Sequence, residues 1–165
     1  MIFLREVQVR QLIKIFLVLA TIALTGFAMA AVEPRVMGDD LFDSLTKGYN
    51  DLSQSKFNAA QAEFENVIKA DFDNPYANNN MAVLMEKQGK FMDAMTYLNI
   101  GEKVAEQYLY RVDTAFLLGG VCAAVNPEKM TAEKSPIAQV IADNKKKLAE
   151  RIGSKPADTP KNLGK

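Results

Sequence analysis

Part of the sequence aligns with itself after a shift of 34 residues. This internal repeat constrains the fold more than any other feature. The shift pairs small residues with small ones and large apolar residues with large ones: Gly48 with Ala82, Ala60 with Ala94, Phe57 with Phe91, and Phe64 with Leu98. Small residues let two helices approach closely, and large apolar residues fill the space between them. The repeat therefore predicts two structural units of similar size.

Apolar residues within the repeat follow a helical period that polar turns interrupt. Four runs have the spacing of an amphipathic helix: Leu41, Leu45, Tyr49 and Leu52; Ala60, Phe64, Val67 and Ile68; Met81, Leu84 and Met85; and Ala94, Tyr97 and Leu98. The interruptions fall at 53–56, 73–75 and 88–90, and Pro75 suits the first turn of a helix. We therefore expect each unit to be a helix–turn–helix hairpin.

The second unit carries a run of residues that resembles the tetratricopeptide repeat. It contains Asn74-Pro75-Tyr76-Ala77, Asn80-Met81-Ala82, Gln88-Gly89-Lys90-Phe91 and Ala94, and the 34-residue period is that of the family. The first unit lacks the glycine that Gly89 supplies to the second. The resemblance covers about residues 41–108 and implies an all-α, right-handed solenoid of helix–turn–helix repeats. An ordinary bundle of helical hairpins has the same periodicity and stays open as an alternative.

Two repeats need further cover, because at least three units are normally required to form a continuous buried surface. The segment 109–125 is apolar and rich in small residues. We expect it to be a degenerate third helix that completes the repeats over 41–125. Asn126-Pro127 should end this helix, so that 126–135 forms a loop.

The end of the chain is expected to contain one more helix and a basic tail. Ser135-Pro136 predicts the start of a capping helix over 136–152, and the turn-rich residues 153–165 are expected to be disordered. Residues 145–165 hold seven cations and two anions, whereas residues 31–144 hold ten cations and 17 anions. The expected body is therefore acidic and the expected tail basic, although the whole chain has no net charge.

Residues 1–30 have the pattern of a signal peptide. A positively charged start precedes an uncharged run over 15–32, which contains the small-x-small sequence Ala28-Met29-Ala30. We expect cleavage before Ala31, followed by a linker over 31–40, so that the mature chain is periplasmic or secreted. The alternative is an uncleaved anchor in the inner membrane, since the uncharged run reaches the short end of the length that spans a membrane.

The composition excludes the commonest catalytic and metal sites. With no His and one Cys, the chain cannot build a Ser-His-Asp site, a His-ligated metal site or an internal disulfide. Asp71-Phe72-Asp73 begins like a calcium loop, but Tyr76 and Ala82 occupy the positions of its Gly and Glu. Cys122 lies in an apolar stretch and is expected to be a buried structural thiol. We expect no metal, no cofactor and no enzymatic activity.

The resemblance also implies a binding surface. In tetratricopeptide arrays the first helix of each unit lines a concave groove, and Asn80 stands near a position that often bonds the backbone of a bound peptide. The residues implied for this groove are Phe42, Leu45, Tyr49, Leu52, Tyr76, Asn79, Asn80, Val83, Glu86 and Lys87. The alternative is that these side chains contact the segment 31–40 or the last helix of the chain itself.

Together these observations favour a non-enzymatic adaptor or scaffold that binds a protein or peptide in the bacterial periplasm, in assembly of an envelope or secretion complex. One alternative is a structural subunit that forms a homo-oligomer through its repeats. Another is a membrane-anchored repeat protein with an uncleaved N-terminal helix. Nucleic acid is not an expected partner, because no aromatic residues lie between the basic ones. An exported chain also leaves the compartment that contains nucleic acid. A hydrolase that uses paired carboxylates is a third class, but no pocket for it can be inferred from the sequence.

Overall fold

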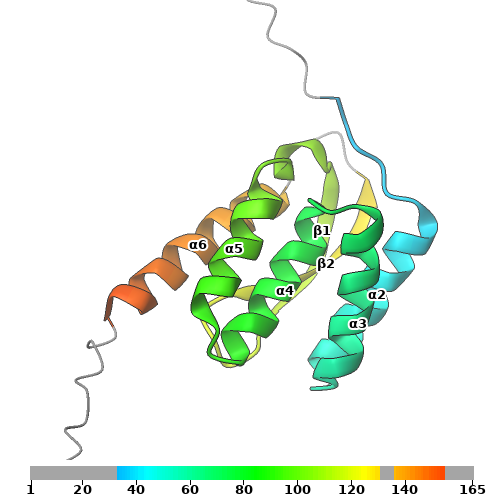
Figure 1. The fold of residues 1–165 in the computed structure, drawn as a ribbon. Helices are drawn as coiled ribbons and strands as arrows, with labels where there is room; N and C mark the ends of the chain where they lie inside the picture. The colour runs from blue at the N-terminus through cyan, green and yellow to red at the C-terminus, as the bar shows by residue number, and fades with distance from the viewer. Residues whose placement is uncertain (1–32, 131–135, 155–165) are drawn as a thin grey trace, which may run out of the picture. The chain divides into compact units, whose positions relative to one another are not determined.

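The structure is a computed structural model that describes residues 33–130 and 136–154 (Figure 1). The expected signal peptide, its cleavage site and the expected tail beyond residue 154 lie outside these ranges. The elements are α2 Asp39–Ser53, α3 Phe57–Ala70, α4 Pro75–Lys87, α5 Phe91–Glu102, the 3-10 turn η1 Ala105–Gln107, β1 Tyr110–Leu117, β2 Ala123–Met130 and α6 Pro136–Ser154. None of the helices in the described ranges is long and apolar enough to cross a membrane.

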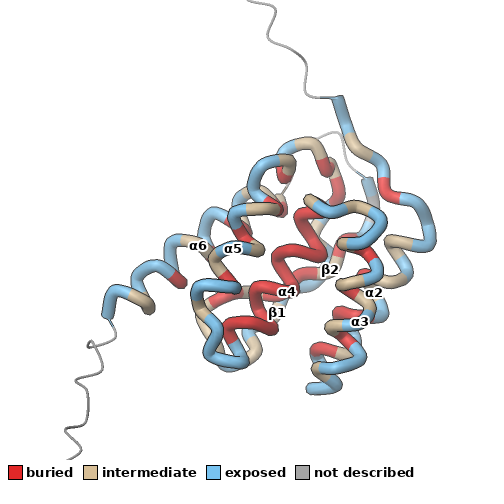
Figure 2. Tube along the Cα trace, viewed as in Figure 1, coloured by how far each residue is buried: buried red, intermediate tan, exposed pale blue. Residues whose placement is uncertain are grey.

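Helices dominate the described residues, but a two-stranded sheet is also present, so the expected all-α fold is confirmed only in the coarser sense of a mostly helical chain. Helix α2 packs on α3, α4 packs on α5, and α3 and α4 join the two pairs. Figure 2 shows that α4 is the most deeply covered helix, and every residue from Pro75 to Glu86 is buried. The two predicted hairpins are therefore present, with α4 at the centre.

The expected third helix over 109–125 is wrong. Strands β1 and β2 form a two-stranded antiparallel sheet instead, so the expected loop over 126–135 begins inside a strand. The pair Gly119-Gly120 separates the two strands, and Gly119 has a φ of +75°. Glycine adopts this left-handed conformation without steric cost, and the chain can therefore reverse at this point. Val112 and Thr114 before the turn and Val125 after it favour extended backbone over a helix.

The turns inside the two helical hairpins have the same geometry at matching positions of the repeat. Ser55 in the first turn has a φ of 61°, and Gly89 in the second has a φ of 76°. In each turn the N–H of the following lysine donates to the carbonyl five residues earlier, with N–O distances of 2.8 and 2.9 Å. This is the hydrogen bond of a Schellman-type helix end. A serine in the first unit thus adopts the conformation that glycine provides in the second.

Exchanging residue types at these two turns should change stability in opposite directions. Ser55→Gly should raise the free energy of unfolding by about 0.5 kcal/mol. Glycine removes the strain of a left-handed non-glycine residue, and the extra conformational entropy that it gives to the unfolded chain offsets only part of this gain. Gly89→Ala should lower it by about 1 kcal/mol, although no atom lies within 4 Å of the added Cβ. Urea unfolding of both variants measures this. Shifts of the same sign would contradict a backbone origin.

Gly48 lies where α2 and α3 pack closely together. A Cβ at this position would lie 2.6 Å from a ring carbon of Phe64, so a side chain here would force the two helices apart. Ala82 and Leu98 occupy the matching places in the second unit, and both are fully buried. The pairing of small and large residues in the sequence therefore corresponds to helix packing within each unit.

The hairpin of β1 and β2 and the helix α6 cover the helices on one side. Strand β2 packs against α4 and α2, while α6 packs against α5, α4 and β1. In Figure 1 the two strands run behind α4. Helix α6 turns Ile137, Ile141 and Leu148 into the core, all fully buried. The β1–β2 hairpin and α6 therefore complete the buried surface that the two helical hairpins cannot form alone.

Candidate functional site

The residues implied for the groove belong to α2 and α4, and the hairpin packs against both of these helices. Phe42 is partly buried and Lys87 is exposed. The other eight are buried: Leu45, Tyr49, Leu52, Tyr76, Asn79, Asn80, Val83 and Glu86. In this conformation the chain's own hairpin covers residues implied for the groove. Partner binding by these residues stays a prediction.

Aromatic residues of the groove contact strand β1. The ring of Tyr49 meets that of Phe116 edge to face, with centroids 5.1 Å apart, and Phe42 lies 6.3 Å from Tyr110. The hydroxyl of Tyr76 donates to the carbonyl of Tyr110 at 2.8 Å. Burial raises the pKa of Tyr76, so this hydroxyl keeps its proton and acts as a donor. These rings hold β1 against α2 and α4.

The side chain of Asn80 binds the main chain of strand β2. Its Nδ2 donates to the carbonyl of Val125 at 2.8 Å, and its Oδ1 accepts from the N–H of Val125 at 2.9 Å. Both residues are fully buried. One side-chain amide therefore satisfies both backbone groups of one residue, as a neighbouring strand would.

A second amide pair binds the same strand two residues earlier. Asn79 donates to the carbonyl of Ala123 at 2.9 Å, and Asn144 of α6 accepts from the N–H of Ala123 at 2.8 Å. Asn144 also donates to Oδ1 of Asn79 at 2.8 Å, which joins α6 to α4. Asn144 is not among the site residues expected from the sequence. Its signal was the spacing of Ile137, Ile141 and Leu148, because this spacing places residue 144 on the same buried face.

Glu86 binds the start of the same segment. Its carboxylate accepts from the N–H groups of Val121 and Cys122, each at 2.9 Å, and it forms an ion pair with Arg151 of α6. Burial raises the pKa of Glu86, but these hydrogen bonds outweigh it and hold the pKa below its ordinary value. A Cβ at Gly120 would collide with this carboxylate. The glycine therefore lets the chain pass close to Glu86.

Cys122 is the free cysteine of the chain and is fully buried. Burial, reinforced by the neighbouring Glu86 carboxylate, raises the pKa of its thiol to about 12. The reactive form of cysteine is the thiolate. The environment of Cys122 therefore disfavours nucleophilic chemistry.

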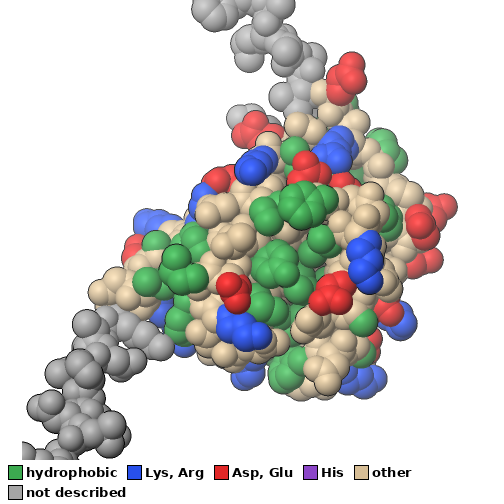
Figure 3. Space-filling model, in the orientation of Figure 1, with side chains coloured by type: hydrophobic (Ala, Val, Ile, Leu, Met, Phe, Trp, Pro, Cys, Tyr) green, Lys and Arg blue, Asp and Glu red, His purple; other side chains and the backbone are tan. Residues whose placement is uncertain are grey.

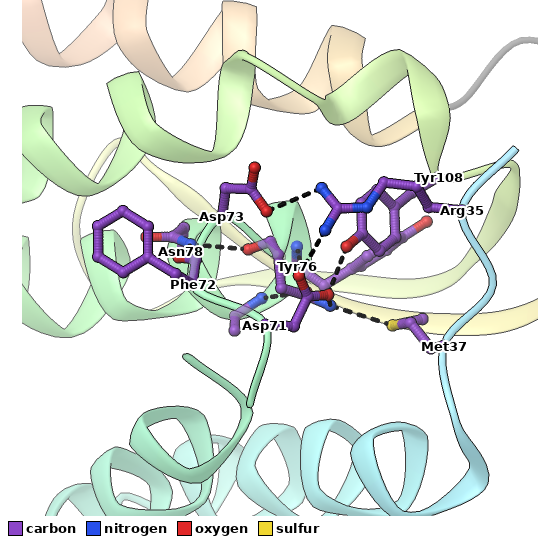
Figure 4. Close-up of polar contacts among 10 residues, drawn as sticks. Arg35, Met37, Asp71, Phe72, Asp73, Tyr76, Asn78 and Tyr108 are labelled. Atoms are coloured by element: carbon purple, nitrogen blue, oxygen red, sulfur yellow. Dashed lines mark hydrogen bonds and ion pairs between the residues drawn. The ribbon is translucent and has the colours of Figure 1, made fainter. Parts of the chain in front are cut away.

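A second polar cluster holds the residues before α2 against the turn between α3 and α4 (Figure 4). Arg35 donates to Asp71 at 2.9 Å and to Asp73 at 2.8 Å, and its guanidinium lies 5.1 Å from the ring centroid of Tyr108. The Tyr108 hydroxyl donates to Asp71. The two carboxylates of Asp71-Phe72-Asp73 therefore bind a guanidinium within the chain.

Met37 completes this attachment. Its N–H donates to the hydroxyl of Tyr110 at 2.8 Å, and its sulfur accepts from Asn74 at 3.3 Å. The Oδ1 of Asn74 also caps α4 by accepting from the N–H groups of Tyr76 and Ala77, each at 3.1 Å. The segment before α2 is thus tied both to the helix cap and to β1.

Arg35 should contribute measurably to stability. We expect Arg35→Ala to lower the free energy of unfolding by about 1 to 2 kcal/mol, because two partly exposed ion pairs and a cation–π contact are lost together. Arg35→Lys should recover less than half of this, since an ammonium cannot bridge both carboxylates as the planar guanidinium does. Guanidinium chloride unfolding tests both variants. The exposed Lys146→Ala is the control, and a loss as large as that of Arg35→Ala would contradict this assignment.

Two further surface features are apolar. A hollow of about 380 Å³ at the turn between α4 and α5 is lined by Gly89, Lys90, Phe91, Met92, Asp93 and Ile152. Hydrophobic side chains also gather over α3, α4 and α5 on the face seen in Figure 3, and Phe72 is 66% exposed. Among the residues that can be described, no three His, Cys, Asp or Glu side chains group to hold a metal.

Comparisons of the chain with protein-family models, with curated proteins and with solved structures found no match in any of the three.

Proposed function

We propose that the chain is a non-enzymatic adaptor of tetratricopeptide-like, right-handed repeat architecture whose groove binds an extended segment through its main chain. The two hairpins, with matching turns one repeat length apart, support this architecture. Strand β2 is the segment that the groove holds in this conformation. With the leader expected from the sequence, the adaptor acts in the periplasm, in assembly of an envelope or secretion complex.

The observation that carries the proposal is the contact of Asn80 with both backbone groups of Val125. A side-chain amide that donates and accepts at one residue recognises the peptide backbone rather than a particular side chain. The same contact can therefore form with a strand of another protein. Asn79 and Glu86 extend this recognition to Ala123 and to the 121–122 segment in the same way.

A partner strand reaches Asn80 only when β2 leaves it. The proposal therefore requires the hairpin to open while the helices stay folded, as local openings do in other proteins. Amide hydrogen exchange at Val125 measures this opening. We expect exchange at Val125 to need less free energy than exchange in the middle of α4. Equal values at both places would mean that the groove opens only on global unfolding, and the proposal would fail.

A peptide of the chain's own sequence over 120–128 is the probe for binding in trans. We expect it to shift the Asn80 side-chain amide signals in an NMR titration of the Asn144→Ala variant, in which α6 no longer holds Ala123. The matched control peptide carries proline in place of Val125 and so lacks one N–H. It should bind about 5- to 10-fold more weakly, the equivalent of one hydrogen bond. Equal binding of the two peptides, or no shift with either, would contradict the proposal.

A further inference from the structure

The outer edge of strand β1 has backbone groups that no other element uses. Val125 directs both its N–H and its C=O to Asn80, so its neighbours in β2 are the residues that bond to β1. These neighbours face Thr114 and Phe116. Backbone groups alternate between the two sides of a strand, so those of Ala115 and Leu117 point away from β2. Within the described ranges no hydrogen bond reaches them.

The two edges of the sheet are therefore treated differently. Side chains of α4 and α6 cap the outer edge of β2, whereas Arg111, Asp113, Ala115 and Leu117 of β1 are exposed. Leu117 is 59% exposed. Exposed edge strands usually carry lysine or proline that blocks pairing. The stretch Thr114–Leu117 carries neither, so it is open to another strand.

The exposed charges of β1 indicate which strand fits. Arg111 and Asp113 are exposed, and neither forms an ion pair within the described part of the chain. They have opposite charge and are two residues apart. In an antiparallel pair of two β1 strands centred on Val112, Arg111 faces Asp113 of the partner subunit, and the same contact forms a second time by symmetry. Opposite charges placed across strands stabilise the pairing.

In this register Val112 lies on the two-fold axis. On the inner side Val112 faces Pro127, which has no N–H to donate to the ladder, and the register of β1 against β2 shifts on both sides of Val112. The centre of the register is therefore where β2 offers β1 the fewest hydrogen bonds.

We propose that β1 pairs with β1 of a second copy of this chain, so that two hairpins form one continuous four-stranded sheet. The groove takes no part in this contact, so the inference does not rest on the proposed function. Each interaction in the pairing is made twice, as in other two-fold dimers.

Analytical ultracentrifugation of the purified chain, processed as the cell leaves it, tests this pairing. We expect a monomer–dimer equilibrium that Ala115→Pro abolishes, because proline removes an outward N–H that the monomer does not use. Arg111→Asp and Asp113→Arg should each weaken the dimer about tenfold, since each places like charges across the strands twice. The double variant Arg111→Asp/Asp113→Arg should return the dissociation constant to within about threefold of the parent, because the pairs are restored with exchanged signs.

The control is Lys146→Asp, a charge reversal on the exposed side of α6, which should leave the dissociation constant unchanged. Circular dichroism of each variant shows whether the monomer stays folded. A chain that is monomeric at millimolar concentration overturns the proposal. A dimer that survives Ala115→Pro also overturns it, as does a double variant whose dimer dissociates as readily as those of the single variants.

Discussion

Replacement of Asn80 by Ala is expected to lower the free energy of unfolding by about 3 to 5 kcal/mol. The variant leaves the N–H and the C=O of Val125 without their partner in a fully buried place. An unsatisfied buried backbone group costs about 1 to 3 kcal/mol, and the missing side-chain atoms add a cavity. This is a large part of the stability of a domain of this size.

Asn99→Ala is the matched control, because Asn99 is exposed on α5. The same chemical change there should alter the free energy of unfolding by less than about 0.5 kcal/mol. Equilibrium denaturation of both variants, with amide exchange at Val125, separates loss of the hairpin contact from general weakening of the helices. A change below about 1 kcal/mol for Asn80→Ala would show that water can replace the amide.

The helices could be predicted from the sequence because their causes are local. The apolar spacing of α2 to α5 and the break at Asn74-Pro75 are contained within a few turns of each helix, and the internal repeat relates one unit to the other. Asn80 was implied by family resemblance as a residue that binds backbone. The structure places it on backbone, but the backbone is the chain's own strand, 45 residues later in the sequence.

The hairpin could not be predicted in the same way. The stretch 109–125 is apolar with many small residues, a composition that suits a closely packed helix as well as a buried strand. Its conformation is decided by distant partners, such as Glu86, which binds the N–H groups of Val121 and Cys122. No local pattern connects a helical glutamate with a segment so far along the chain. The same reason applies to Arg35, whose partners Asp71 and Asp73 lie 36 and 38 residues further along the chain.

Replacement of Glu86 by Gln should lower the free energy of unfolding by about 3 kcal/mol at neutral pH. A glutamine oxygen can accept from one of the two N–H groups, but its NH₂ then faces the other donor and the guanidinium of Arg151. Glu150, exposed on α6, provides the matched control. Glu150→Gln should change the free energy by less than about 0.5 kcal/mol.

The effect of Glu86 should also depend on pH in one direction. The folded state holds the pKa of Glu86 below its ordinary value of 4.5, so the unfolded chain binds the proton more readily. The stabilisation is therefore complete above pH 4.5 and is lost as the pH falls through the lower folded pKa. Because the glutamine of the variant does not titrate, the gap between the parent and Glu86→Gln should be constant from about pH 5 to 7 and should narrow in more acidic solution. Urea unfolding at a series of pH values measures this gap, and a gap that widens in acid would mean that the carboxylate is not the group that binds the segment at 121–122.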